Sequence, residues 1–139
     1  YLPAGNIHAY LDGLGVELMT ASDNVLRGGL TPKHIDVAEL LGVLDFAPVP
    51  VPYLVPTSTA ERAQVFHPEG QDFELVRIEN RGRLTLSGPA IVLVTEGTLR
   101  LEGALSAIDV ARGATVYVTP DEAALAVSGS GELFIATTA

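Results

Sequence analysis

The sequence contains no cysteine, a single lysine and no long apolar run. Without cysteine, the protein has neither a disulfide framework nor a thiolate metal site. Its longest apolar stretches, such as residues 90–94, are far shorter than the roughly 20 residues that a membrane-spanning helix needs. The chain also opens without an initiator methionine and without a signal-peptide pattern. We therefore expect a cytoplasmic protein that does not span a membrane.

Positive charge is scarce as well: 8 Lys and Arg stand against 17 Asp and Glu, for a net charge of −9. A general nucleic-acid surface is not expected, because the phosphate backbone requires a basic one. An anionic ligand would need a local basic pocket, since the overall field repels it. The single lysine, Lys33, stands among seven arginines. This bias suggests a site where a guanidinium would not fit.

Residues 63–139 are expected to form a small β-sandwich or barrel. They hold runs of β-branched residues punctuated by glycine- and proline-containing turns. The glycines of "TEG" and "SGSG" are interpreted as turns, which separates "AIVLVTE" from "TLRLEG" and "AALAVSG" from "ELFIATT". No histidine follows His67, and no carboxylates cluster with the spacing of metal ligands. This barrel is therefore expected to be free of metal.

Residues 1–62 do not show the strand pattern of residues 63–139. Residues 47–62 begin with "APVPVPYLVP", whose prolines indicate an extended linker. Ahead of it, Asp36 is a plausible N-cap with Glu39 as its capping-box partner. Apolar residues then recur at the spacing of one helix face: Val37, Leu40, Leu41 and Leu44. One short helix is therefore predicted after Pro32.

Potentially chemical side chains are concentrated in residues 1–46. Pro3 and Gly5 form a turn, and His8 follows in a pattern that is compatible with a metal ligand at the mouth of a barrel. One histidine cannot hold a metal, because a catalytic zinc takes about three protein ligands. The role of His8 therefore has to be judged from the residues that follow it.

That stretch, "HAYLDGLGVELMTASDNVLRGGLTPKHIDV", resembles the type I phosphomannose isomerases. The matching motifs are His-Ala-Tyr at 8–10, Glu-x-Met at 17–19, Ser-Asp-Asn-Val-x-Arg at 22–27 and Thr-Pro-Lys at 31–33. The resemblance is close over residues 1–46. The rest of the chain fits more loosely, as the metal-free cupin barrel that ends such enzymes.

The resemblance implies a mainly β, cupin-like fold with one short helix. Residues 1–46 would be the end of a second, truncated cupin barrel, and residues 63–139 the C-terminal barrel. It also implies interconversion of mannose 6-phosphate and fructose 6-phosphate with zinc. The family holds zinc with a Gln-x-His pair, a Glu and a final His, which His8 matches. The other three ligands lie upstream, so the chain is expected to be a C-terminal portion, inactive without the missing N-terminal part.

The resemblance also implies roles for other residues. Glu17 would face inward as an acid/base or hydrogen-bonding group, although a carboxylate on a strand can equally face solvent. Arg27 would contact the substrate and stabilise developing negative charge, since arginine stays charged when partly buried. Asp23 would assist ring opening or orient catalytic groups, and a purely structural loop role remains equally open.

Two further residues are expected to bind substrate. Lys33 is a candidate for contact with the phosphate, and Tyr10 either lines the sugar pocket or packs in the core. His34 and His67 have no partner pattern and are interpreted as bystanders. A non-catalytic cupin-like binding or structural module is the alternative, because residues 47–139 carry no chemical constellation.

Overall fold

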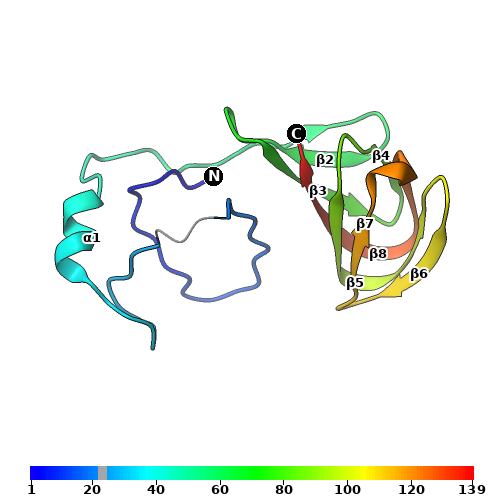
Figure 1. Cartoon of the computed structure of the whole chain (residues 1–139). Coiled ribbons are helices and arrows are strands. Elements are labelled where there is room, and N and C mark those ends of the chain that lie inside the picture. The colour runs from blue at the N-terminus through cyan, green and yellow to red at the C-terminus, as the bar shows by residue number, and fades with distance from the viewer. Residues whose placement is uncertain (22–24) are drawn as a thin grey trace. The chain divides into compact units, whose positions relative to one another are not determined.

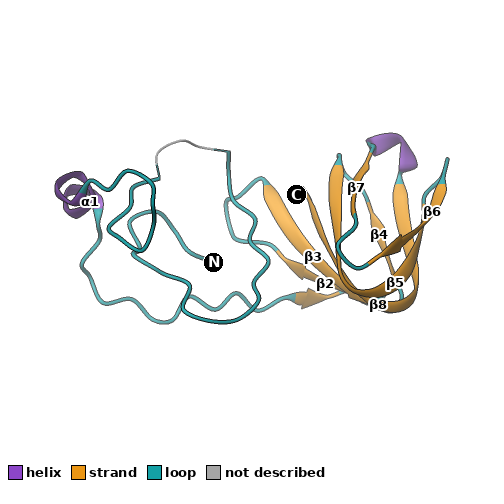
Figure 2. Cartoon of the chain, turned by 90° about the horizontal axis from the view of Figure 1, so that it is seen from below, coloured by secondary structure: helices purple, strands orange, loops and turns teal. Residues whose placement is uncertain are grey.

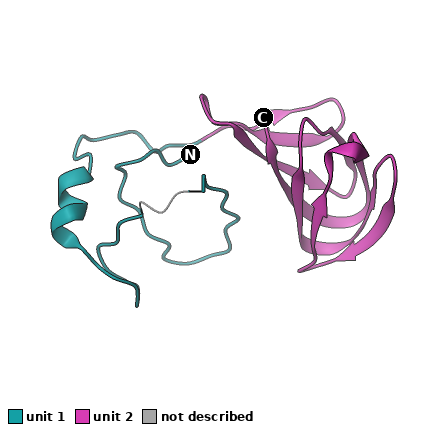
Figure 3. Ribbon diagram, in the orientation of Figure 1, with its two compact units in different colours: residues 1–53 teal, residues 54–139 magenta. Residues whose placement is uncertain are grey.

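In a computed structural model, which describes residues 1–21 and 25–139, the chain divides into two compact units (Figure 3). The first unit comprises residues 1–53 and the second residues 54–139. The boundary falls inside the proline-rich stretch, where residues 47–56 form neither helix nor strand. No helix among the described residues is long and apolar enough to cross a membrane.

The predicted helix is present as α1 (Val37–Val43). Asp36 is its N-cap, and its side chain accepts a hydrogen bond of 3.0 Å from the backbone N–H of Glu39. At the other end the N–H of Leu44 donates to the carbonyl of Leu40, at 3.1 Å. Of the predicted apolar face only Leu40 and Leu44 are half-buried, whereas Val37 and Leu41 are exposed at 51% and 53%.

The strands expected near His8 and Glu17 are not formed. In the described part of residues 1–53 the only regular element is α1, and the rest is loop (Figure 2). Several apolar residues in this region remain strongly exposed, Leu11 and Leu14 among them at 91% and 88%. A strand is stable only when a neighbouring strand pairs with its N–H and C=O groups. The expected strands therefore lack a pairing partner among the described residues.

The second unit is a single eight-stranded antiparallel sheet that curls around its core (Figure 1). Its strands are β1 (Thr57–Ser58), β2 (Ala63–Phe66), β3 (Phe73–Glu79), β4 (Gly82–Thr85), β5 (Ala90–Glu102), β6 (Ala107–Ala111), β7 (Thr115–Val118) and β8 (Ala124–Thr138). A short 3₁₀ helix, η1 (Pro120–Glu122), lies between β7 and β8.

Two long strands organise this sheet. β5 and β8 pair along nearly their whole length, from Ala90↔Thr137 to Glu102↔Ala126. The edge of β8 that faces away from β5 pairs with β3 at one end and with β4 at the other. The edge of β5 that faces away from β8 pairs with β7 at one end and with β6 at the other. Each long strand thus takes part in both halves of the barrel.

The interpretation of "TEG" and "SGSG" as turns was wrong, because these glycines lie inside β5 and β8. Gly97 pairs with Gly131 beside a register shift between Val94 and Glu96. Both glycines have positive φ, and a methyl group on either would lie 2.0 Å from a backbone oxygen of the facing strand. Glycine here lets the two strands bend while they stay paired.

The core of the barrel is aliphatic. Sixteen hydrophobic residues are buried, and the largest fully buried side chains are Ile78, Leu99, Leu133, Ile135, Val76, Val92 and Val94. They come from β3, β5 and β8, where every second residue points inward. The interior of this barrel is therefore packed hydrocarbon.

Glu122 connects η1 to the turn between β5 and β6. Its carboxylate accepts hydrogen bonds from the backbone N–H of Leu105 at 2.7 Å, and from the backbone N–H and hydroxyl of Ser106. Gly103 lies directly against this side chain, and any Cβ there would overlap it. The hydroxyl of Ser106 and the N–H of Leu105 lower the pKa of Glu122.

Replacing Glu122 by glutamine is expected to lower the thermal unfolding temperature by several degrees at neutral pH, because the anion that these donors stabilise is lost. A carboxylate with a lowered pKa in the folded state stabilises the fold above its ordinary pKa. That contribution is lost as pH falls through the lowered value. Circular dichroism melts from pH 7 to pH 3 should show the two proteins converging in acid. The exposed Glu102→Gln serves as the control and should melt like wild type throughout.

Candidate functional site

His8 lies three residues beyond the turn formed by Pro3, Ala4 and Gly5. Its side chain is exposed, and Nδ1 lies 3.0 Å from the backbone oxygen of Asn6. Because a carbonyl oxygen can only accept a hydrogen bond, this contact assigns the ring proton to Nδ1. The lone pair of Nε2 is then directed away from the turn. A histidine held in this tautomer is suited to ligate a metal through Nε2.

Tyr10 lies between two other candidate residues, His8 and Glu17. The rings of His8 and Tyr10 meet edge to face, with centroids 6.3 Å apart and planes at 77°. Hydrogen bonding to the carboxylate of Glu17 raises the pKa of Tyr10, since only the protonated phenol can donate to a carboxylate. Tyr10 is therefore placed against the imidazole of His8 through its ring and against the carboxylate of Glu17 through its hydroxyl. All three side chains are exposed.

Arg27 and Lys33 make only local hydrogen bonds among the described residues. The guanidinium of Arg27, a half-buried residue, donates to the carbonyl of Val25 at 3.4 Å. The backbone N–H of Lys33 donates to the hydroxyl of Thr31 at 3.2 Å, and its side chain is exposed. Asp23, the remaining candidate, lies outside the described residues. The proposed roles of all these side chains stay predictions.

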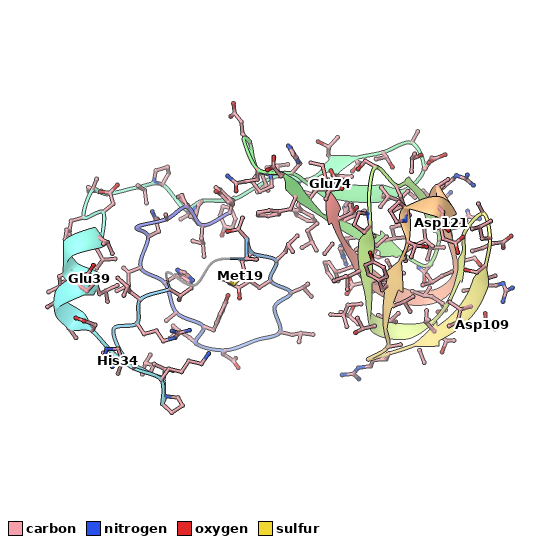
Figure 4. The ribbon with its side chains drawn as sticks, viewed as in Figure 1. Met19, His34, Glu39, Glu74, Asp109 and Asp121 are labelled. Atoms are coloured by element: carbon pink, nitrogen blue, oxygen red, sulfur yellow. The ribbon has the colours of Figure 1, made fainter. Side chains whose placement is uncertain are left out.

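The bystander histidines are both exposed. His34 lies just before α1 (Figure 4), and His67 follows β2. Among the described residues no group of three or more His, Cys, Asp or Glu is arranged to hold a metal ion. His8 is thus one candidate ligand, and any further donors to the same ion have to come from elsewhere.

Two hollows of the second unit are lined by polar groups that already bond to one another. One, of about 70 Å³, is lined by Glu122, whose carboxylate accepts the hydrogen bonds described above. The other, of about 380 Å³, is lined by Arg77, which donates to Glu132 at 2.7 Å and also pairs with Glu79. The hydroxyl of Thr95 and the guanidinium of Arg77 lower the pKa of Glu132. These groups stabilise the barrel.

Three contributors to the candidate site were missed by the sequence reading. The backbone oxygen of Asn6 fixes the ring of His8, and the backbone of Gly5 accepts a hydrogen bond from the N–H of Asp45 at 3.0 Å. Gly28 packs against the side chain of Leu40. The first two act through the main chain, so no side-chain pattern could have revealed them.

Curated relatives identify what the chain is similar to, although no family model matches it. It is 34% identical to the mannose-6-phosphate isomerase of Rattus norvegicus over 137 residues, which cover 90% of this chain and 32% of the relative. It is 31% identical to the enzyme of that name from Escherichia coli, over 96% of this chain and 35% of the relative. The chain therefore spans about a third of the length of the curated relatives that it matches.

Solved structures agree with these relatives. Mannose 6-phosphate isomerase from Salmonella typhimurium in its apo form matches with a TM-score of 0.71 and 28% identity, over 86% of this chain and 32% of that one. The same enzyme bound to fructose 6-phosphate and zinc also matches with a TM-score of 0.71. The predicted fold class, a mainly β cupin-like barrel with one short helix, is confirmed. The truncated second barrel remains a prediction.

Proposed function

The chain is homologous to the mannose-6-phosphate isomerases along about a third of their length, and we propose that it is the C-terminal portion of a zinc-dependent enzyme that interconverts mannose 6-phosphate and fructose 6-phosphate. The homology over 90% and 96% of the chain to the rat and Escherichia coli enzymes carries this proposal. The similar structure that contains both fructose 6-phosphate and zinc supports the choice of substrate and metal.

His8 fits the chemistry of a zinc ligand. Its Nδ1 is engaged by the oxygen of Asn6, which leaves Nε2 available. A neutral imidazole is a common zinc donor, and the exposed position of His8 leaves room for other ligands. Zinc, when bound, would polarise an oxygen of the sugar and so ease removal of a proton from the neighbouring carbon.

The remaining zinc ligands would come from an N-terminal part that precedes this chain in the complete enzyme. A catalytic zinc normally takes three protein ligands and keeps one position open. By resemblance, those missing are a Gln-x-His pair and a Glu. The same part would supply partner strands for the extended segments near His8 and Glu17, and would thereby complete the truncated barrel. The exposed Leu11 and Leu14 would then be covered.

The side chains of this portion would serve the proton transfer and the substrate. Aldose–ketose isomerisation moves a proton between adjacent carbons, so it needs an acid/base at that point. Glu17 would take this role, and the hydroxyl of Tyr10, which hydrogen bonds to it, would orient its carboxylate while lining the sugar pocket. Asp23 would assist opening of the sugar ring.

The two cations would meet the negative charge of the substrate. Arg27 is half-buried and stays protonated, so it would stabilise the charge that develops on oxygen during the reaction. Lys33 would contact the phosphate as a compact point charge. Such local cations are needed because the chain as a whole carries a net charge of −9.

The purified chain is expected to show no isomerase activity, because it supplies only one of the zinc ligands. The measurement is a coupled assay of fructose 6-phosphate formation from mannose 6-phosphate, with zinc added. The complete enzyme, this chain preceded by its N-terminal part, should turn over in the same assay. Turnover by the 139-residue chain alone would contradict the proposed division of the site. A complete protein that binds no zinc would instead favour a non-catalytic cupin-like module.

A further inference from the structure

Helix α1 contacts the segments that carry His8 and Arg27. The backbone N–H of Asp45, two residues beyond the helix, donates to the carbonyl of Gly5 at 3.0 Å. On the other segment, Gly28 lies so close to the helix that a methyl group there would come within 2.8 Å of Cδ2 of Leu40. These contacts lie three residues from His8 and one residue from Arg27.

We infer that α1 is a brace that holds the candidate zinc ligand and the candidate substrate arginine in place, with Gly5, Gly28, Leu40 and Asp45 as its positioning residues. This inference rests on the proposed function, in which His8 binds zinc and Arg27 binds substrate. The brace itself touches neither zinc nor sugar, and it acts only through the two segments.

The local bonds of His8 and Arg27 show why a brace is needed. Each side chain bonds to a backbone oxygen only two residues away, at Asn6 and Val25 respectively. Such bonds fix a side chain on its own segment but cannot set the distance between segments. In the described part of the first unit no sheet performs that task either. Contacts to a common helix can.

α1 is well defined despite its seven residues. Its first turn is capped by Asp36, and its last turn is closed by the hydrogen bond from Leu44 to Leu40. Beyond it, the carboxylate of Asp45 accepts a hydrogen bond of 2.9 Å from the N–H of Ala47. This bond holds the backbone of Asp45 where its own N–H meets Gly5.

The two contact points limit side-chain size for different reasons. Gly5 has a φ of +83°, which strains any other residue, and a Cβ there would lie 3.4 Å from the backbone N of Asp45 and the carbonyl of Val43. Gly28 has no such backbone constraint, and a Cβ there would displace only Cδ2 of Leu40, at the end of a flexible side chain. Gly13, which also has a positive φ, and Gly29 have nothing within 4 Å of the same position and are the matched controls for Gly5 and Gly28.

In the complete enzyme, Gly28→Ala is expected to lower kcat/KM about tenfold with zinc content unchanged, since small displacements of a substrate-binding group are costly. Gly29→Ala should leave kcat/KM at the wild-type value. The double variant Gly28→Ala/Leu40→Ala should be no worse than Leu40→Ala alone, because the clash is then removed. Equal effects of the two glycine changes, or additive losses in the double variant, would overturn the brace.

A measurement on the isolated chain separates this inference from the proposed function. Gly28→Ala should shift the NMR signals of the Leu40 methyl groups, and Gly5→Ala should speed hydrogen exchange at the amide of Asp45. Gly29→Ala and Gly13→Ala should do neither. If these shifts occur but the complete protein binds no zinc, the proposed function fails while the brace stands. If neither the NMR signals of Leu40 nor the hydrogen exchange of Asp45 changes, the brace is wrong even if the complete enzyme binds zinc and is active.

Discussion

Replacing His8 by alanine in the complete enzyme is expected to remove most of its zinc and to lower isomerase activity by more than about a hundredfold. Changes to groups that merely orient a metal ligand cost up to about a hundredfold, so loss of a ligand should cost more. Among the described residues no group of three or more His, Cys, Asp or Glu is arranged to hold the ion without His8. Zinc per protein, measured by plasma emission spectrometry, and turnover should fall together.

His34→Ala and His67→Ala are the matched controls for this change. Both residues are exposed histidines, one in each unit of the chain. Each control should retain full zinc and full activity. A His8→Ala enzyme that keeps one zinc per chain would exclude His8 as a ligand, and the resemblance would then have misassigned the final histidine.

Replacing Arg27 by alanine is expected to reduce kcat by about a hundred- to a thousandfold, the cost of removing one group that stabilises transition-state charge. Zinc content should stay at the wild-type level, because arginine is not a zinc ligand. Among the described residues the guanidinium bonds only to the carbonyl of Val25, so its removal breaks no described hydrogen bond to another segment. Steady-state kinetics and metal analysis on the same preparation test both parts.

Arg112→Ala, in the exposed turn between β6 and β7, is the control for lost charge and should be kinetically silent. An Arg27→Ala enzyme that loses zinc and activity equally would indicate a collapsed loop and no direct role in charge stabilisation. If the Arg27→Ala enzyme kept the wild-type kcat, Arg27 would have no role in the reaction.

The regular part of the fold was largely predictable from the sequence. The periodic apolar residues after Pro32, with Asp36 ahead of them, predicted α1 and its cap, because both signals are local. The β-branched runs of residues 63–139 likewise predicted an all-β barrel. The long strands β5 and β8 were divided wrongly. Gly97 and Gly131 face each other across the sheet, and that pairing is a tertiary fact with no local signature.

The sequence predicted which residues are candidates for the site, but not the contacts that hold them. The motif around His8 and Glu17 identified side chains, and the structure places them with Tyr10. It did not predict the brace, because the contacts of Gly5 with Asp45 and of Gly28 with Leu40 join distant segments through backbone and shape. The strand expected at Glu17 was not formed. A strand needs a neighbouring strand to pair with, and the sequence around Glu17 does not show whether one is present.

The most direct test of the central claim is an anomalous-difference map of the complete enzyme, recorded at the zinc absorption edge. One zinc peak is expected, with Nε2 of His8 about 2.0–2.1 Å away and every other protein ligand in the N-terminal part of the complete enzyme. A zinc whose ligands do not include His8, or no zinc peak at all, would contradict it.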